Sequence, residues 1–241
     1  MSISFFAMPM TPGRETPSSS APLSATTRIG ALAAAVSGVL FLAFPLLRPW
    51  PDEATATPEL AAAFASDRWM LAHVSGAVAL LLVPGALLAV AGLTRVTPGA
   101  TAARAATVAA WLSLAGILLF FGAETFGIHV IAAEAVQTWD PSFLDAVEDL
   151  RNQPLAVTLF GAGLVLLAAA GALLAVAVWR SGSRRWAGLA FGAALVGVLP
   201  QFFTPPSVRI AHGVLYAVGA LILAAWLTRA AAARSGRRPS A

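Results

Sequence analysis

Six long apolar runs alternate with short polar segments along the chain. They are Ile29 to Leu47, Trp69 to Leu93, Ala105 to Ala133, Leu155 to Trp179, Trp186 to Phe203 and Ile210 to Leu227. A helix needs ~20 residues, at a rise of 1.5 Å each, to cross the hydrocarbon core of a bilayer. The pattern therefore predicts an all-α polytopic bundle of six spanning helices. The fifth and sixth runs are the shortest, and the fifth has Pro200 near its end, so its span has the least support.

The two ends of the chain lack this pattern. Residues 1–27 are rich in Pro, Ser and Thr, which predicts a disordered tail. Residues 28–229 hold the six-helix transmembrane domain, and residues 230–241 form an Arg-rich tail. Ala54-Thr55-Ala56 resembles a signal-peptide cleavage site, but the first apolar run is longer than the ~7–15 residues of a signal peptide. We therefore expect the first helix to be retained.

Composition favours a membrane protein over a water-soluble one. Apolar residues make up 59% of the chain and charged residues 11%, and the mean hydropathy is +0.80. Soluble domains carry roughly a quarter charged residues. The chain has no cysteine, which excludes disulfides and thiolate metal sites.

Arginine is unevenly distributed between the two sides of the predicted bundle. Eleven of the fifteen Arg, with one acid, fall on one side when the connecting segments are assigned alternately, and four Arg with nine acids fall on the other. Because Arg gathers on the cytoplasmic side, both termini are predicted to be cytoplasmic. The Arg180 to Arg185 loop is expected to contact anionic lipid. Arg clusters beside apolar runs are topology signals. The predicted partner is therefore the lipid bilayer, and no nucleic acid is expected to bind.

Two outer segments are predicted to form short helices. Thr57-Pro58-Glu59 combines a cap, a first-turn proline and a first-turn acid, and we expect its helix to run on into the second span. Asp140 to Arg151 places Phe143, Leu144, Val147 and Leu150 on one face and acids on the other. This predicts an amphipathic helix on the outer surface, either a lid over a cavity or a cover for helix ends.

Small residues and tryptophans also follow patterns. Gly188 and Gly192 form a G-x-x-x-G pair, which predicts close helix packing inside the bundle. Trp50, Trp69 and Trp139 lie at predicted outer boundaries, where tryptophan is enriched in membrane proteins.

Four ionisable residues lie within the predicted spans: His73, Glu124, His129 and His212. The three histidines are predicted to lie in the outer leaflet, His73 about 6 Å inside the boundary. Glu124 is predicted roughly 13 Å from the outer end of its helix, near the bilayer centre. A carboxylate at that depth costs ~2.5–3.5 kcal/mol, so Glu124 is the first candidate for a functional residue.

Three chemistries remain open for this candidate polar cluster. A divalent metal site could use His73, His129 and His212, but Glu124 and His129 are about 140° apart on their helix and do not share a face. A bis-imidazole haem would need two facing histidines. A proton relay could use histidine and Glu124. Arg68, Arg151 and Arg209 at the outer mouth could shape a polar vestibule above Glu124, or pair with Asp67, Asp149 or lipid phosphate.

Several residues together resemble a group of uncharacterised bacterial integral membrane proteins that is common in actinobacteria. They are Asp67-Arg68-Trp69 with His73, Glu124 late in the third helix, Trp179-Arg180-Ser181-Gly182, Arg185-Trp186-Ala187 and His212-Gly213. The resemblance covers roughly residues 28–229. It implies six helices and a location in the bacterial inner membrane, and it implies no activity.

Two function classes follow from the sequence. The favoured one is a non-enzymatic membrane protein that handles a proton or small solute through an outward-facing polar vestibule. The alternative is a haem- or metal-binding redox protein or enzyme that uses the intramembrane histidines. No catalytic set is identified.

Overall fold

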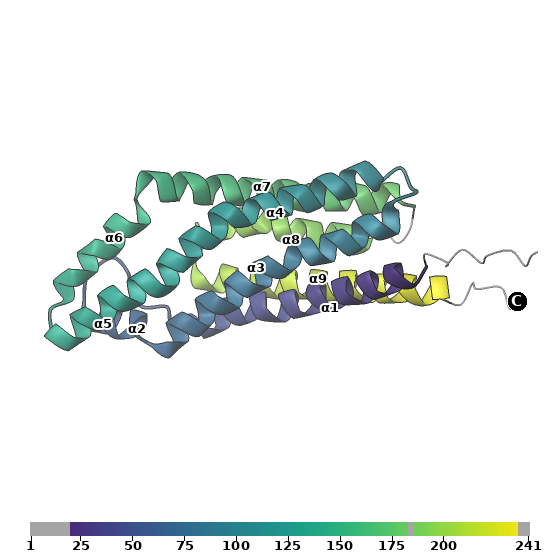
Figure 1. Cartoon of the computed structure of the whole chain (residues 1–241). Helices are drawn as coiled ribbons and strands as arrows, with labels where there is room; N and C mark the ends of the chain where they lie inside the picture. The colour runs from purple at the N-terminus through teal and green to yellow at the C-terminus, as the bar shows by residue number, and fades with distance from the viewer. Residues whose placement is uncertain (1–19, 183–185, 236–241) are drawn as a thin grey trace, which may run out of the picture.

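The computed structural model describes residues 20–182 and 186–235, and all their regular structure is helical (Figure 1). The elements are α1 (Ser20–Leu47), α2 (Pro58–Phe64), α3 (Asp67–Thr94), α4 (Ala100–Gly122), the π-helix η1 (Ala123–Gly127), α5 (Ile128–Thr138), the 3-10 helix η2 (Pro141–Leu144), α6 (Asp145–Arg151), α7 (Pro154–Arg180), α8 (Trp186–Gln201) and α9 (Pro206–Ser235). The predicted all-α class is confirmed. Residues 1–19 and 236–241 of the predicted tails lie outside the described residues, whereas residues 20–27 and 230–235 belong to α1 and α9.

Five helical segments within the described residues are long and apolar enough to cross a membrane. They are Ala25–Leu47, Asp67–Thr94, Ala100–Thr138, Pro154–Arg180 and Pro206–Ala230. The apolar helix α8 has only 16 residues, so it extends ~24 Å against the ~30 Å of a hydrocarbon core. The predicted fifth span is thus the one that falls short in length.

The six long helices form a closed ring in chain order. Each of α1, α3, α4, α7, α8 and α9 packs against the next, and α9 packs back against α1. The start of α1 and the end of α9 lie at the same end of this bundle (Figure 1). Between them the chain runs along the bundle six times, with α8 as the fifth helix of the ring.

Glycine permits close packing between α7 and α8. A methyl group at Gly192 would lie 2.5 Å from the Gly171 carbonyl oxygen, and one at Gly171 would lie 2.5 Å from the Gly192 carbonyl oxygen. One at Gly188 would lie 2.5 Å from Cβ of Val178. The G-x-x-x-G pair of α8 therefore packs against α7 inside the bundle, as predicted.

A cap of short helices, α2, α5, η2 and α6, lies at the opposite end of the bundle from the two chain ends (Figure 1). It has its own hydrophobic core, separate from that of the bundle. The buried residues of this core are Leu60, Ala61, Phe64, Trp69, Ile128, Ala132, Ala135, Leu144 and Val147. The predicted helix over residues 140–151 is present as η2 and α6, and Leu144 and Val147 form its buried face while Phe143 remains exposed.

The predicted continuity of α2 with the second span is wrong. The Thr57 side chain caps α2 as expected, accepting a hydrogen bond from the Leu60 N–H at 3.1 Å. The helix nevertheless ends at Phe64, and Ser66 caps a new helix by accepting from the Trp69 N–H at 3.3 Å. The break turns α2 back onto α5, where its apolar face is buried in the cap.

The tryptophan pattern is a second difference. Trp69 is fully buried, with its ring 4.4 Å from the Phe64 ring and 4.0 Å from the His73 ring. Trp139 is 90% exposed at the end of α5, in a left-handed backbone conformation. Trp69 is thus a core residue of the cap, whereas Trp139 is at the surface of the protein.

The third long helical segment extends into the cap, and Glu124 lies before the part of it that enters the cap. The helical segment runs from Ala100 to Thr138, and its last turns contribute Ile128, Ala132 and Ala135 to the core of the cap. Glu124 lies where the bundle meets the cap.

Candidate functional site

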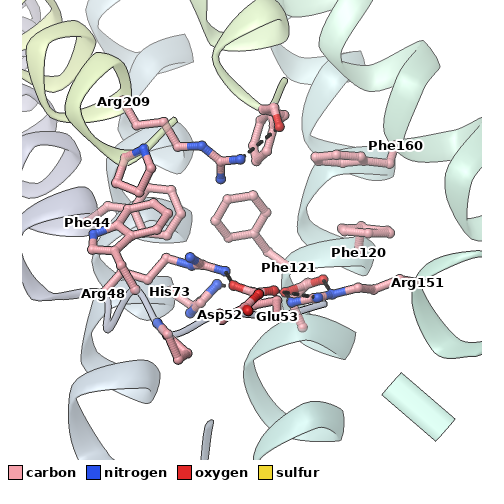
Figure 2. Close-up of a pocket in the computed structure, with 15 residues that line it drawn as sticks. Phe44, Arg48, Asp52, Glu53, His73, Phe120, Phe121, Arg151, Phe160 and Arg209 are labelled. Carbon is pink, nitrogen blue, oxygen red and sulfur yellow. Dashed lines mark hydrogen bonds and ion pairs between the residues drawn. The ribbon is translucent and has the colours of Figure 1, made fainter. Parts of the chain in front are cut away.

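A cavity of about 460 Å³ lies between the bundle and the cap. Its walls come from α1 and the loop after it, α3, α4, η1, α6, α7 and the start of α9. The lining residues are Phe44, Arg48, Trp50, Pro51, Asp52, Glu53, His73, Phe120, Phe121, Glu124, Arg151, Phe160, Phe202, Pro206 and Arg209 (Figure 2). The cavity thus combines five phenylalanines with three arginines and three carboxylates. Pockets of ~300–1,000 Å³ with this mixture are typical of small-molecule sites.

A chain of four ion-paired residues crosses one side of the cavity. Arg48 Nη2 donates to Glu53 Oε1 at 2.6 Å, and Arg151 Nη1 donates to Glu53 Oε2 at 2.8 Å. Arg151 also donates through Nε to Glu124 Oε1 at 2.7 Å and through Nη2 to Glu124 Oε2 at 3.2 Å. Such two-point contacts are among the stronger and more directional hydrogen bonds in proteins. These ion pairs connect the end of α1, the loop after it, α6 and η1 around the cavity.

The π-helical turn determines where Glu124 points. In η1 the backbone departs from the i to i−4 hydrogen-bond pattern, and the Glu124 carbonyl accepts a hydrogen bond from the Trp69 indole N–H at 3.0 Å. Single π-turns within α-helices are frequent at functional sites. The bond joins α3 to η1 and holds the Glu124 backbone beside the cavity.

His73 lies next to Glu124 but is not hydrogen-bonded to it. The His73 Nδ1 is 2.8 Å from the Trp69 carbonyl oxygen, which can only accept, so Nδ1 is the donor. The Nε2 is left facing Glu124 Oε2 at 3.8 Å, which is too long for a hydrogen bond. Phe44 covers the imidazole in an edge-to-face contact at 5.3 Å.

Trp50 lies against two guanidinium groups at the edge of the cavity. The Arg48 Cζ is 4.3 Å and the Arg209 Cζ is 5.3 Å from the centre of the Trp50 ring. The Trp50 indole N–H donates to the Pro45 carbonyl at 3.0 Å, which fixes the ring. Cations stack favourably on indole faces, so Trp50 keeps both arginines at the cavity wall.

The pKa values of Glu53 and Arg151, which lie outside the long helices, are shifted by the charges of their ion-pair partners. Burial alone would raise the pKa of the Glu53 carboxyl, but the guanidinium groups of Arg48 and Arg151 outweigh it and hold that pKa below its ordinary value. Burial alone would lower the pKa of Arg151, but Glu124 and Glu53 raise it. Both partners are therefore kept charged.

The structure separates the four residues of the predicted polar cluster. His73 and Glu124 meet at the cavity. His129 lies in the cap, with Nδ1 3.3 Å from the Phe64 carbonyl oxygen, and His212 lies between α8 and α9, with Nε2 2.8 Å from the Ala194 carbonyl oxygen. Neither of these two lines the cavity.

His212 has a local partner that satisfies it. Its Nδ1 is 2.8 Å from Gln201 Oε1, while Gln201 Nε2 is buried without a hydrogen-bond partner. Rotating the Gln201 amide by half a turn lets Nε2 donate to Nδ1 and leaves a neutral ring whose Nε2–H donates to Ala194. His212 thus acts as a packing and hydrogen-bonding residue between two helices.

This placement bears on the metal and haem alternatives. Within residues 20–182 and 186–235, no group of three or more His, Asp or Glu side chains is arranged to hold a metal ion. His73 keeps a free Nε2 at the cavity, but His129 lies in the cap and both ring nitrogens of His212 are engaged between α8 and α9. The three histidines therefore do not converge on one site, as both alternatives would need.

Sequence reasoning identified part of the site and missed part. Arg151 and Arg209 were expected near Glu124, and both line the cavity; Arg151 pairs with Glu124 and Glu53, not with Asp149. Arg68 is exposed and does not line it. Arg48 and Glu53 were not singled out, and Trp50 was named only as a boundary tryptophan. Their only signal is an Arg and an acid within one short proline-rich loop, which does not show that the loop folds over the bundle.

Comparison of the chain with protein-family models, curated proteins and solved structures found no match.

Proposed function

We propose that the chain is a non-enzymatic multi-pass protein of a bacterial inner membrane, with six spans and both termini in the cytoplasm, whose outward-facing cavity handles a small solute or a proton. The observation that carries the proposal is the cavity of about 460 Å³ where bundle and cap meet, lined by charged and aromatic side chains. In membrane proteins, ionisable side chains that face an internal cavity often mark the functional site.

Two features support the topology. The ring of helices returns the chain to the end from which it started, which requires an even number of crossings (Figure 1). Arg180 ends α7 and Arg229 lies near the end of α9, both away from the cap, while Asp140, Asp145 and Glu148 belong to the cap. This asymmetry favours an outward-facing cap. Arg180 and its loop are proposed to contact anionic lipid.

The geometry favours a solute over a proton relay. Both oxygens of Glu124 are engaged by Arg151, and His73 is beyond hydrogen-bond distance of the carboxylate. A relay needs donors and acceptors within hydrogen-bond reach of one another. The ion pairs instead form one rigid wall of a space large enough for a small molecule.

The test is a binding screen with a blocked variant. The Tm of the purified protein in a non-ionic detergent is measured in the presence of cationic, neutral and anionic solutes. At least one class is expected to raise Tm saturably in the wild type. Phe160→Trp, which enlarges a ring of the cavity wall, is expected to weaken this effect, whereas Phe126→Trp, at an exposed position outside the cavity, retains it. Saturable binding by no class, or binding unaffected by Phe160→Trp, contradicts the proposal.

Two further measurements separate the remaining alternatives. Glu124→Gln keeps the shape of the side chain and removes its charge. If solute binding by this variant depends on pH in the same way as binding by the wild type, Glu124 is excluded as a proton site. We expect the absorption spectrum of the purified protein to lack a Soret band. A Soret band would favour the haem alternative and contradict the proposal.

A further inference from the structure

Among the described residues, Arg209 is the arginine of the cavity lining that takes no part in the chain of ion pairs. It lies in the first turn of α9, and its Nε and Nη2 donate to the Thr204 and Phe202 carbonyl oxygens at 2.9 and 2.8 Å. These two bonds fix the plane of the guanidinium against the turn before α9. A guanidinium has five N–H donors, so its remaining N–H groups, including both on Nη1, are available to the cavity.

The charges around Arg209 leave it uncompensated. Among the residues that the structure describes, it forms no ion pair, whereas Arg48 and Arg151 share Glu53 and Glu124. Asp52, the other carboxylate of the lining, is exposed, and its Oδ1 accepts from the Ala54 N–H in the loop. Arg209 and Arg48 also lie against the same Trp50 ring. The two guanidinium charges repel each other, and of the two only Arg48 has a carboxylate partner among the described residues, Glu53.

The space in front of Arg209 is apolar. Figure 2 shows its guanidinium on the opposite side of the cavity from the ion pairs, with phenylalanine rings between them. The Phe160 ring contacts the Phe202 ring edge-to-face at 5.2 Å and stacks on Phe120 at 4.2 Å. A ligand that places an anionic group on Arg209 therefore has an apolar or aromatic body beside it.

From this juxtaposition we infer that Arg209 is the anion-binding residue of the cavity and that the ligand is a small organic oxyanion, a carboxylate or phosphate group on an apolar body. The inference rests on the proposed function, because it names the class of solute that the cavity accepts. Arginine binds both groups through paired N–H donors. A free acid and a lipid headgroup share this chemistry.

The test compares two probes that differ in charge alone. 3-Phenylpropionate and the neutral 3-phenylpropanol are titrated by calorimetry into the full-length protein in dodecyl maltoside. The wild type is expected to bind the acid at least about tenfold more tightly than the alcohol, as a charge-assisted contact implies. Arg209→Gln is expected to lose this preference, and Arg68→Gln, which removes an exposed arginine outside the cavity, keeps it.

The preference is a ratio measured on one sample, so it does not depend on how much of a variant is folded. Equal binding of acid and alcohol by the wild type overturns the inference, as does a preference that survives Arg209→Gln. If neither probe binds but a cation or neutral solute does, in a manner that Phe160→Trp weakens, the inference fails and the proposed function stands. If no solute binds the cavity, both fail.

A second arm identifies the source of the anion. The acid is titrated in nanodiscs of phosphatidylcholine with and without phosphatidylglycerol. An apparent Kd that rises with phosphatidylglycerol, and does so only while Arg209 is present, assigns the site to a lipid headgroup. An unchanged Kd assigns it to a free organic acid, and either result agrees with an oxyanion on Arg209.

Discussion

Arg151, the last residue of α6, makes a two-point contact with Glu124 in the π-helical turn, with N–O distances of 2.7 and 3.2 Å. The two residues are far apart in the sequence, and the contact attaches the cap to the bundle beside the cavity. The side chain of Glu124 is 12% exposed and that of Arg151 26%. The pair is therefore shielded enough from water for its loss to be measurable.

Removing the cation of this pair should cost more than neutralising the anion. Arg151→Gln leaves Glu124 largely buried without its guanidinium, and we expect a loss of about 1–3 kcal/mol in the free energy of unfolding. Glu124→Gln keeps an oxygen that can accept from Arg151, so we expect a smaller loss. Denaturant titration of the purified variants measures both.

Asp149→Asn is the matched control, since Asp149 is an exposed carboxylate on the same helix as Arg151. We expect it to leave the unfolding free energy within about 0.5 kcal/mol of the wild type. An Asp149→Asn effect as large as that of Arg151→Gln would mean that α6 is held by a different contact.

The α7–α8 contact should not tolerate a methyl group at Gly192. Gly192→Ala would place Cβ 2.5 Å from the Gly171 backbone oxygen, so the helices must separate. We expect a loss of about 1–3 kcal/mol, typical of overpacking. Gly161→Ala in α7 has no atom within 4 Å of the new Cβ, and its higher helix propensity should stabilise by up to about 1 kcal/mol. Equal effects of the two substitutions would contradict the close packing of α7 on α8.

The left-handed residues at two helix ends give opposite expectations. Trp139 ends α5 with φ 56°, and Gly182 follows α7 with φ 73°. Trp139→Gly should raise stability by about 1 kcal/mol because glycine adopts this conformation freely. Gly182→Ala should lower it by about 1 kcal/mol, since no atom lies within 4 Å of the new Cβ and only the backbone conformation changes. Thermal melts that move in the same direction for both variants would contradict these backbone conformations.

Acid should weaken the chain of ion pairs through Glu53. The pKa of Glu53 is lowered in the folded protein from its ordinary value of 4.5. Its contribution to stability is therefore fully present above pH 4.5 and disappears as the pH falls through the lowered pKa. We expect the Tm difference between wild type and Glu53→Gln to be largest near pH 7 and to shrink as the pH is lowered from 4.5. Glu134→Gln, at an exposed position of α5, should show no such difference; a gap that persists at low pH would contradict the ion-paired state of Glu53.

The long helices could be predicted from the sequence because lipid-length apolar runs leave few alternatives. The same hydrophobicity rule did not reveal that Ile128 and Ala132, at the end of the third predicted run, belong to the core of the cap. Hydropathy does not distinguish burial in lipid from burial in protein. The depth of Glu124 in the bilayer therefore stays a prediction.

The candidate site was predictable only in part, because its contacts join distant segments. Glu124 and His73 were found since charge within an apolar run is costly. Glu53 and Trp50 lie in a polar loop, where such residues are common, and the loop's path over the bundle depends on tertiary contacts. The π-helical turn at Ala123–Gly127 has no sequence signature that we recognised.

The most direct test of an outward-facing cavity uses the absence of cysteine from the chain. Single cysteines are placed at Asp52, which lines the cavity, and at Ser181, which follows α7 at the opposite end of the bundle. In intact cells a membrane-impermeant maleimide should label Asp52→Cys, and it should label Ser181→Cys only after the membrane is permeabilised. Labelling of Ser181→Cys but not of Asp52→Cys in intact cells, or of both equally, would contradict an outward-facing cavity.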